Sequence, residues 1–333
     1  MRNISIQALR LLCLMLASVV TLVACQQTRD TKIIRMAHGL DVTHPVHHAI
    51  KHMDEQLRVL SGGTMQIDIY PSGQLGSERE LIELLQIGSL GMTKVSASPL
   101  ESFVPEMKIF SIPYVFNDNE HLWRVLNGSI GKGLLAATQK YRIRGMAYYD
   151  AGSRSFYSCK KPIYTPEDLA GMKIRVQKSQ TSIDMVAALG GSATPISWGE
   201  LYTALQQGVV DGAENNPPSF HLSKHYEVCK YYTIDEHTSV PDVILLSNVV
   251  WEALSAQEQK WLQQAVDASV IYQRERWKAA TQEAMRAVQN AGVEVIYPDK
   301  LLFQQKVVGL HQGYQDTKIG ALLSAIKSEG EIQ

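Results

Sequence analysis

The sequence predicts an α/β protein with two domains, and the stretch from 171 to 218 is the first reason. Short apolar runs alternate there with runs of helical period. Lys173–Val176 has the length and the Ile/Val content of a buried strand, and Ser179–Leu189 carries apolar residues at helical spacing. A strand, two helices and a second strand in succession need crossover connections, which favour parallel pairing in one sheet.

The second reason is a helix that is too long for one small domain. Ser255 begins a capping box with Glu258, and a helical period then continues to Ala291 before Gly292 ends it. At about 1.5 Å per residue such a helix spans roughly 50 Å. Because its apolar residues form no clean heptad repeat, we expect it to run across two domains rather than to form a coiled coil.

The first 24 residues, 1–24, are predicted to be a signal peptide. Arg2 and Arg10 give a basic start, and the apolar run 11–24 is too short for a spanning helix, which needs about 20 residues. Small residues directly before Cys25 are typical of lipoprotein cleavage, which predicts export, cleavage before Cys25 and a lipid on its sulfur. The alternative is ordinary secretory cleavage nearby, with Cys25 removed or unmodified.

Cleavage before Cys25 leaves 309 of the 333 residues and changes the formal charge from −1 to −3, since Arg2 and Arg10 are lost. This length favours two domains over one, and nothing in the charge favours nucleic-acid binding. After Cys25 the chain contains only Cys159 and Cys229. Two such cysteines often pair in an oxidising compartment, but two buried free thiols fit the sequence equally well.

The other elements are predicted from local period and turn residues. A capping box at Ser197 and Glu200 is expected to open a helix that Gly208 ends. The segment 237–242 is expected to be a loop between two strands. We expect further strands at 32–37, 65–70, 143–149, 226–233, 243–247 and 293–297, helices at 78–87 and 131–141, and two short helices at the end of the chain.

The segment Gly152–Arg154 is expected to be the first crossing between the two domains. After a tether at 25–31, the predicted first lobe then comprises 32–152 and 240–280. The predicted second lobe comprises 153–239 and 281–333.

Four histidines lie close together at the start of a predicted helix: His44, His47, His48 and His52. His48 and His52 share one helix face because they are four residues apart, so a metal site has to be considered. No cysteine or Asp–His signature accompanies them, which favours a solvated histidine-rich face and no metal.

Two arginines are candidates for binding an anion. Arg175 lies within an apolar strand, where a guanidinium is costly unless it is exposed or paired. In parallel sheets ligands lie at the carboxyl ends of strands, so we interpret Arg175 as a bidentate clamp on a ligand carboxylate. The alternative is a structural salt bridge. Arg154, flanked by serines, is either a second cation for the same anion or a charge at the hinge.

Three other residues suit a polyhydroxylated ligand. Trp198 offers a face for the C–H groups of a sugar, although a lone aromatic residue often belongs to the core. Asn215 has both a donor and an acceptor for hydroxyl groups, and Glu214 either accepts from hydroxyls or caps local backbone. The absence of Gly-x-Ser-x-Gly, of a dinucleotide or P-loop motif and of HExxH favours a binding protein that is no enzyme and needs no cofactor.

The segments Lys-Ile-Arg-Val at 173–176 and Trp-Gly-Glu-Leu-Tyr-Thr-Ala-Leu-Gln-Gln-Gly-Val-Val-Asp-Gly-Ala-Glu-Asn-Asn at 198–216 closely resemble the solute-binding subunit of TRAP transporters, the DctP-like family. The resemblance covers essentially the whole mature chain and includes 74–76, 112–114 and 164–169. It implies a two-lobed periplasmic solute-binding protein fold, similar to type II, with a long helix across both lobes. It also implies capture of an organic acid in the periplasm and delivery to integral-membrane subunits driven by a sodium gradient.

The same resemblance assigns roles to four residues of the predicted second lobe. Arg175 matches the family's carboxylate-clamping arginine, and Arg154 matches a second arginine often found near the ligand. Trp198 falls where an aromatic residue commonly packs on the ligand, and Asn215 matches the asparagine of the Glu-Asn pair. Three matches are weaker. Glu78 and Ser96 fall at first-domain positions that often touch the rest of the ligand, and His237 falls in the loop that returns to the first domain.

The segment 211–220, followed by His-Tyr-Glu-Val, resembles members that bind sugar acids, including hexuronates. Glu78, Lys94 and Ser96 provide polar partners on the first-domain side, and buried hydroxyls need such partners. A plain C4-dicarboxylate would need more cations. We therefore expect glucuronate or galacturonate, with another sugar acid, a C4-dicarboxylate or an ABC importer's binding protein as the alternatives, and a metal carrier or extracytoplasmic enzyme as the remoter ones.

Overall fold

A computed structural model describes residues 31–331 of the chain. From Ile33 onward the chain forms one compact unit. The predicted signal peptide and Cys25 lie outside the described residues. Within residues 31–331, no helix combines the length and the apolar character that crossing a membrane requires.

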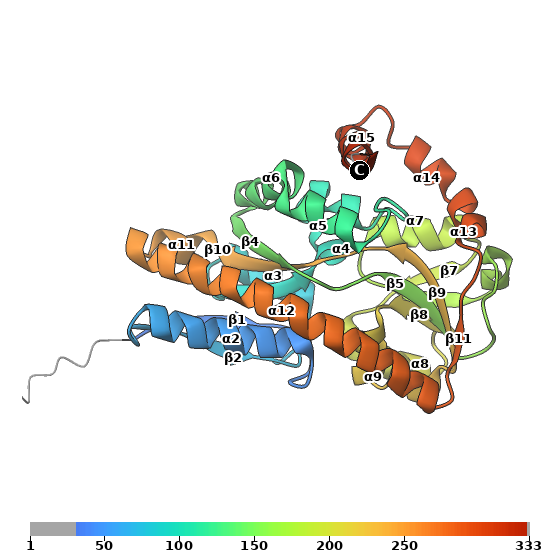
Figure 1. Ribbon diagram of the computed structural model, residues 1–333, viewed down its shortest axis with the longest axis horizontal. Coiled ribbons are helices and arrows are strands. Elements are labelled where there is room, and N and C mark those ends of the chain that lie inside the picture. Colours follow the sequence, from blue (N-terminus) through green and yellow to red (C-terminus); the bar gives the residue numbers. More distant parts are fainter. Residues whose placement is uncertain (1–30, 332–333) are drawn as a thin grey trace, which may run out of the picture. The chain divides into compact units, whose positions relative to one another are not determined.

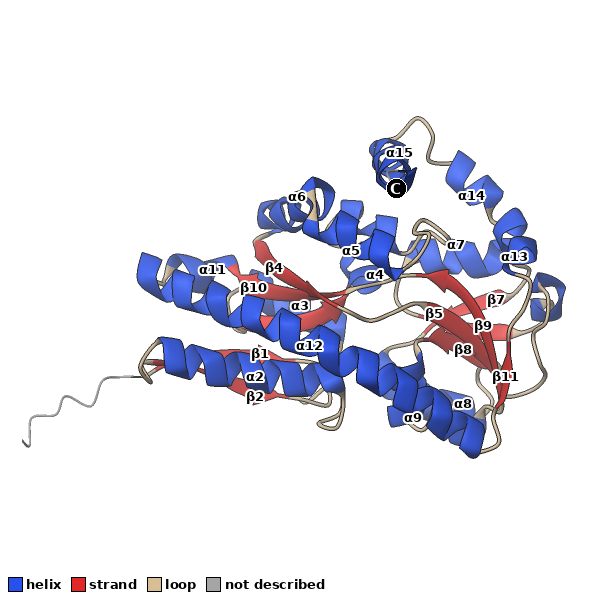
Figure 2. Ribbon diagram, in the orientation of Figure 1, coloured by secondary structure: helices blue, strands red, loops and turns tan. Residues whose placement is uncertain are grey.

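Two separate β-sheets form the framework of residues 33–331, and Figure 2 shows them in red with helices around each. The first has the order β2-β1-β3-β10-β4 and the second the order β11-β9-β5-β8-β6-β7. The five strands are β1 (Lys32–Ala37), β2 (Met65–Tyr70), β3 (Met92–Ser96), β4 (Ile143–Tyr149) and β10 (Asp242–Ser247). The six strands are β5 (Arg154–Ser158), β6 (Lys173–Val176), β7 (Ser192–Pro195), β8 (Gly212–Asn215), β9 (Tyr231–Thr238) and β11 (Glu294–Ile296).

Both sheets are mixed. β6 pairs in parallel with β7 and β8, which confirms the parallel arrangement predicted for the stretch from 171 to 218. β5 pairs antiparallel with β8 and β9, and β10 pairs antiparallel with β3 and β4. Each sheet with its helices is called a body below, and the prediction of an α/β fold with two such bodies is confirmed.

Helices surround each sheet. The five-stranded body contains α2 (Pro45–Leu60), α3 (Glu78–Gln86), α4 (Ala97–Leu100), the 3₁₀ helix η1 (Pro105–Phe110), α5 (Asn119–Asn127), α6 (Ser129–Ala137) with η2 (Thr138–Tyr141), α11 (Asn248–Glu252) and α15 (Lys318–Glu331). The six-stranded body contains η3 (Pro166–Leu169), α7 (Gln180–Ala188), η4 (Trp198–Glu200), α8 (Leu201–Gln206), α9 (Pro217–Leu222), α10 (His225–Val228), α13 (Lys300–Lys306) and α14 (Val308–Gln312).

The long helix α12 (Ala256–Asn290) contacts both bodies, as predicted (Figure 1). Its capping box at Ser255 and Glu258 is present. Its first half packs on α2 and β4, where Leu262 is fully buried, and its later turns pack on α9, with Val288 in the core of the six-stranded body. One rigid element therefore links the two bodies.

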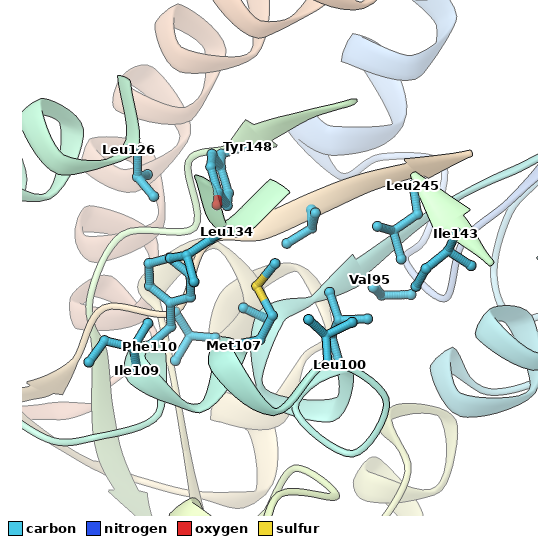
Figure 3. Close-up of a cluster of buried hydrophobic side chains, with 14 of the residues drawn as sticks. Val95, Leu100, Met107, Ile109, Phe110, Leu126, Leu134, Ile143, Tyr148 and Leu245 are labelled. Carbon is cyan, nitrogen blue, oxygen red and sulfur yellow. The ribbon is translucent and has the colours of Figure 1, made fainter. Parts of the chain in front are cut away.

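The core of the five-stranded body is built from apolar residues of several elements (Figure 3). Phe110, Tyr148 and Leu245 come from η1, β4 and β10 and meet in one buried cluster. The hydroxyl of Tyr148 donates to the carbonyl oxygen of Gly131 at 2.9 Å, so its polar group is satisfied. Burying each such side chain stabilises the fold by about 1.5–3 kcal/mol, which fixes the sheet on which one side of the site is built.

The C-terminal segment corrects the predicted domain boundaries. The sequence assigned 281–333 to the second lobe and expected two short helices, whereas α15 returns to the five-stranded body and packs on α5 and η1. Ile326 is buried in that core, and Nε2 of His121 lies 2.9 Å from the carbonyl oxygen of Ile326. Helical period in a sequence shows that an apolar face exists, but not which body that face covers.

Two local predictions were also wrong. His237 was expected in a loop, but β9 extends to Thr238 and pairs with β5 there, so the loop before β10 is short. The capping box expected at Ser197 is absent, because a 3₁₀ turn over Trp198–Glu200 precedes α8. Both corrections concern residues near the site.

The structure joins Cys159 and Cys229 in a disulfide across 70 residues of sequence. Cys159 directly follows β5, and Cys229 lies two residues before β9, with its side chain fully buried. The bond therefore fastens two neighbouring strands of the six-stranded sheet.

Candidate ligand-binding site

Arg175 lies in β6, between the parallel neighbours β7 and β8, and is 2 % exposed. Its Nε donates to the carbonyl oxygen of Ile196 at 2.9 Å. Its Nη1 is buried and has no hydrogen-bond partner among the described residues. Burial lowers the pKa of Arg175, with Glu214 opposing that shift. A buried guanidinium with an unused donor is costly unless an anion completes it.

Arg154, in β5, is bound quite differently. Its Nε and Nη2 both bond to the carboxylate of Glu214, the second at 2.9 Å, and Nη2 also donates to the backbone carbonyl oxygen of Glu214 at 2.7 Å. Its Nη1 donates to Oδ1 of Asn215 at 3.0 Å. Most of the donors of Arg154 are therefore used inside the protein, which leaves Arg175 better placed to bind an anion.

Glu214 belongs to a buried network of alternating charges. Burial alone would raise the pKa of Glu214, but Arg154 and His237 outweigh it and lower the value to about 2. For His237, burial favours a lower pKa, yet Asp235 at 2.8 Å and Glu214 at 3.7 Å raise it to about 9. Asp235 also accepts from the backbone nitrogen of Phe156 at 3.1 Å. His237 is consequently protonated at neutral pH.

This network lies behind the site and does not line it. Glu214 and His237 were predicted to contact the ligand, but neither lines the cavities described below. Glu214 orients Arg154, and Arg154 in turn donates to Oδ1 of Asn215, so Glu214 supports two residues that line the cleft. Contact of Glu214 and His237 with the ligand stays a prediction. The side-chain nitrogen of Asn215 has no hydrogen bond to another described residue and is left as a donor.

A cleft between the two bodies consists of two adjoining cavities. The larger, about 440 Å³, has Arg175 and the segment 196–200 on one side and Ser77 to Glu80 on the other. The smaller, about 50 Å³, is lined by polar residues of both bodies. Trp198, Gln177, Gly39 and Glu78 border both cavities. The Cζ atom of Arg175 lies 5.9 Å from the centre of a Trp198 ring, so cation and aromatic face stand side by side.

On the five-stranded side, Lys94 lies between two carboxylates. Its Nζ donates to Oδ1 of Asp242 at 3.1 Å and is 3.6 Å from Oε1 of Glu78. Burial would lower the pKa of Lys94, but these carboxylates raise it, while burial raises the pKa of Glu78. Glu78 also accepts from the backbone nitrogen of Ser96 at 2.9 Å, and the Ser96 hydroxyl donates to Oε1 of Gln177 at 3.4 Å. This side presents a dense set of acceptors and donors.

The structure thus brings most of the predicted site residues to one cleft: Arg175, Asn215, Arg154, Trp198, Glu78, Ser96 and Lys94. Sequence reasoning missed Gln177, Asn216 and Asp242. Gln177 follows β6 and Asn216 follows β8, so the rule that ligands lie at strand ends could have found both. Asp242 had no such signal, because its partner Lys94 is 148 residues away in sequence.

The histidines at the start of α2 have structural partners. His44 caps α2 by accepting from the backbone nitrogen of Val46 at 3.3 Å, and Nε2 of His38 lies 3.1 Å from Nδ1 of His47. The ring of His52 stacks on Tyr272 with centres 4.5 Å apart. Within residues 31–331, no group of three or more His, Cys, Asp or Glu side chains is arranged to hold a metal ion.

The sequence profile of the DctP family, described as bacterial extracellular solute-binding protein, family 7, matches residues 36–317. This chain is a TRAP solute-binding protein of the DctP family. It is 38 % identical over 286 residues to the YiiZ protein of Salmonella typhimurium, and the match covers 85 % of this chain and 87 % of that protein.

Solved structures of TRAP solute-binding proteins have the same fold. One from a Bradyrhizobium species, in complex with galacturonate, has 40 % sequence identity and a TM-score of 0.87, and the match covers 89 % of this chain and 100 % of that one. Another, from Anaerococcus prevotii with bound glucuronate, has 37 % identity and a TM-score of 0.88, with 90 % and 99 % covered. The two-lobed solute-binding fold predicted from the resemblance is confirmed.

Proposed function

We propose that this protein captures a hexuronate, D-glucuronate or D-galacturonate, for a TRAP transporter. The observation that carries the proposal is Arg175, a buried guanidinium whose Nη1 has no partner within residues 31–331 and which lines a cavity of about 440 Å³. A carboxylate would complete this donor set in a bidentate pair, which is the geometry that arginine favours. The structures of similar proteins with galacturonate and glucuronate support the same ligand class.

The remaining groups of the cleft suit the hydroxyls of a sugar acid. The side-chain nitrogen of Asn215 is a donor with no partner among the described residues, and Glu78, Lys94 and Asp242 form a cluster of both donors and acceptors. Trp198 offers an aromatic face beside Arg175 for the apolar side of a pyranose ring. A C4-dicarboxylate has a second charged end, and Lys94 and Arg154 already have carboxylate partners, so it fits this cleft less well.

Capture would proceed by closure of two lobes about the connecting segments. An acid enters the open cleft, pairs with Arg175 and is buried when the lobes close. Loss of water then strengthens the ion pair. We assign 32–152, 240–280 and α15 to the first lobe, since α15 packs on α5 and η1.

The partners we propose are the integral-membrane subunits of a TRAP transporter, with the protein held at the membrane from the periplasmic side. A lipid on Cys25 would provide that attachment after removal of residues 1–24. A single acyl chain anchors weakly, so several chains on this cysteine would be required.

A thermal-shift screen against uronates, aldonates and C4-dicarboxylates tests the proposal, followed by calorimetry on the positive compounds. Ligands that bind only the folded protein raise its melting temperature. We expect the largest shifts with D-glucuronate and D-galacturonate and none with glucose, which lacks the carboxylate. A shift with succinate that exceeds the shift with either uronate would assign the protein to the dicarboxylate class instead.

A further inference from the structure

A carboxylate outside the ligand cleft joins the two bodies. Glu101 follows α4 in the five-stranded body and is 7 % exposed. Its Oε1 accepts from the backbone nitrogen of Thr181, which lies in the first turn of α7 in the six-stranded body, at 3.1 Å. Its Oε2 is buried and has no hydrogen-bond partner among residues 31–331. The buried carboxylate of Glu101 therefore forms a hydrogen bond between the two bodies.

This contact completes the cap of a helix. The first N–H groups of a helix lack acceptors inside it. In α7, the N-cap residue Ser179 satisfies one of them by accepting from the backbone nitrogen of Ser182 at 3.0 Å. Glu101 supplies the acceptor for Thr181, whose side chain is also buried. A negative charge at a helix N-terminus interacts favourably with the helix dipole. The capping group here comes from the opposite body.

The contact lies close to the ligand cleft but is not part of it. Pro99, two residues before Glu101, lines the larger cavity, as do Gln177 and Lys178 just before α7. Glu101 and Thr181 line neither cavity of the cleft. A change at Glu101 therefore alters how the bodies meet while leaving every cleft-lining residue in place.

We propose that Glu101 is an affinity-determining residue that acts as a closure latch, an inference that rests on the proposed capture of an acid by lobe closure. When the bodies separate, Thr181 and Glu101 are both hydrated and nothing is lost. When they meet without the carboxylate, the buried nitrogen of Thr181 has no acceptor, and closure becomes less favourable. Ligand binding that depends on closure is weakened by the same factor.

The test compares Glu101→Ala and Glu101→Gln with the wild-type chain by calorimetry and stopped-flow binding of D-glucuronate. We expect about a tenfold higher Kd for Glu101→Ala, mainly through faster dissociation, as most affinity changes within one interface arise there. Glu101→Gln keeps an oxygen acceptor but loses the charge, so about a threefold increase is expected. Glu106→Ala is the matched control, since Glu106 lies in η1 of the same body and its Oε2 is likewise buried with no hydrogen-bond partner among residues 31–331.

Hydrogen exchange distinguishes a latch from a general loss of stability. In the ligand-bound wild type the amide of Thr181 should be protected, and in ligand-bound Glu101→Ala it should exchange faster, with the melting temperature of the ligand-free protein unchanged. An unchanged Kd and unchanged exchange at Thr181 would overturn the proposal. If the wild type binds no uronate, the proposed ligand class is wrong. The Kd of Glu101→Ala is then compared with that of the wild type for the acid that the screen identifies, and this comparison tests the role of Glu101.

Discussion

On the six-stranded side of the cleft, Arg175 keeps a buried nitrogen that has no partner in the described part of the chain, whereas on the five-stranded side Lys94 lies between Asp242 and Glu78. Both cations are almost fully buried. The charge of Arg175 is left without a carboxylate hydrogen-bonded to it, whereas the charge of Lys94 is neutralised by neighbouring carboxylates. We infer that the first side recognises the charge of the ligand and that the second side recognises its hydroxyls.

The two arginines of the six-stranded body differ in the same way. Arg154 has a carboxylate partner in Glu214, and a second ion pair links Glu214 to His237. Arg175 is similarly buried, but among residues 31–331 its one hydrogen-bond partner is a backbone carbonyl oxygen, that of Ile196. Burial of an arginine therefore does not identify a binding group, whereas an unused donor beside a cavity does.

The largest expected effect is a difference in the free energy of unfolding between variants of these two arginines. Arg154→Ala should lower the free energy of unfolding by about 3–5 kcal/mol, because it leaves the buried carboxylate of Glu214 without its main partner. Arg175→Ala should leave stability in the absence of ligand unchanged or raise it. Urea unfolding followed by circular dichroism measures both variants, and equal losses would show that the two arginines have the same role.

Ligand affinity, in contrast to stability, should depend mainly on Arg175. Arg175→Ala should weaken uronate binding by about 3 kcal/mol or more, since the ligand carboxylate loses its counter-ion, and Arg175→Lys should also lose affinity because it lacks the planar fork. Arg79→Ala is the control, because Arg79 lines the same cleft but pairs with Glu83 at 3.2 Å. Calorimetry that found normal binding by Arg175→Ala would refute the clamp.

On the five-stranded side we expect a smaller effect that depends on the hydroxyls of the ligand. Asp242→Asn should weaken D-glucuronate binding by about 1–2 kcal/mol, because it removes a charged acceptor and disturbs Lys94. Binding of a carboxylic acid without hydroxyl groups should change less. Calorimetric titration of the variant with both ligands tests this difference, and equal losses for both would contradict the division between the two sides.

The pH dependence of stability is the smallest expected effect, and in the six-stranded body it depends on the buried network of His237 and Glu214. His237 has a pKa raised to about 9, so its contribution is complete below about 6.5 and is lost as the pH rises through 9. Glu214 has a pKa lowered to about 2, so its contribution is complete above about 4.5 and is lost as the pH falls through 2.

Stability from this network should therefore be greatest between about pH 4.5 and 6.5 and should fall toward pH 9 with a slope of at most about 1.4 kcal/mol per unit. His237→Gln should flatten the alkaline part of the curve. Unfolding free energies measured from pH 6 to 10 for both proteins test this, and identical slopes would exclude His237 as the titrating group.

The sequence predicted those parts of the molecule that depend on local pattern. β6, α7 and α12 follow from apolar period and caps, and the position of Arg175 near the end of a parallel strand marked it correctly as a residue of the cleft. Pairing over long distances in sequence was not predictable. Arg154 was expected to be a second cation for the anion or a charge at the hinge. Its ion pair with Glu214, 60 residues away in sequence, could not be found without the fold.

The placement of α15 was wrong for a related reason. Its apolar residues are compatible with either body, and only the complementary surface of α5 and η1 decides between them. Glu101 also gave no signal, because the amide that it contacts, that of Thr181, lies 80 residues later in the chain.

The place of β10 in the five-stranded sheet has a consequence for how the chain folds. β10 lies between β3 and β4, yet it comes from 242–247, after nearly all of the six-stranded sheet has been synthesised. Until that strand arrives, β3 and β4 each have an open edge that can pair with other chains. Such distant pairing is slow, so the newly made polypeptide would need protection from aggregation until β10 is available.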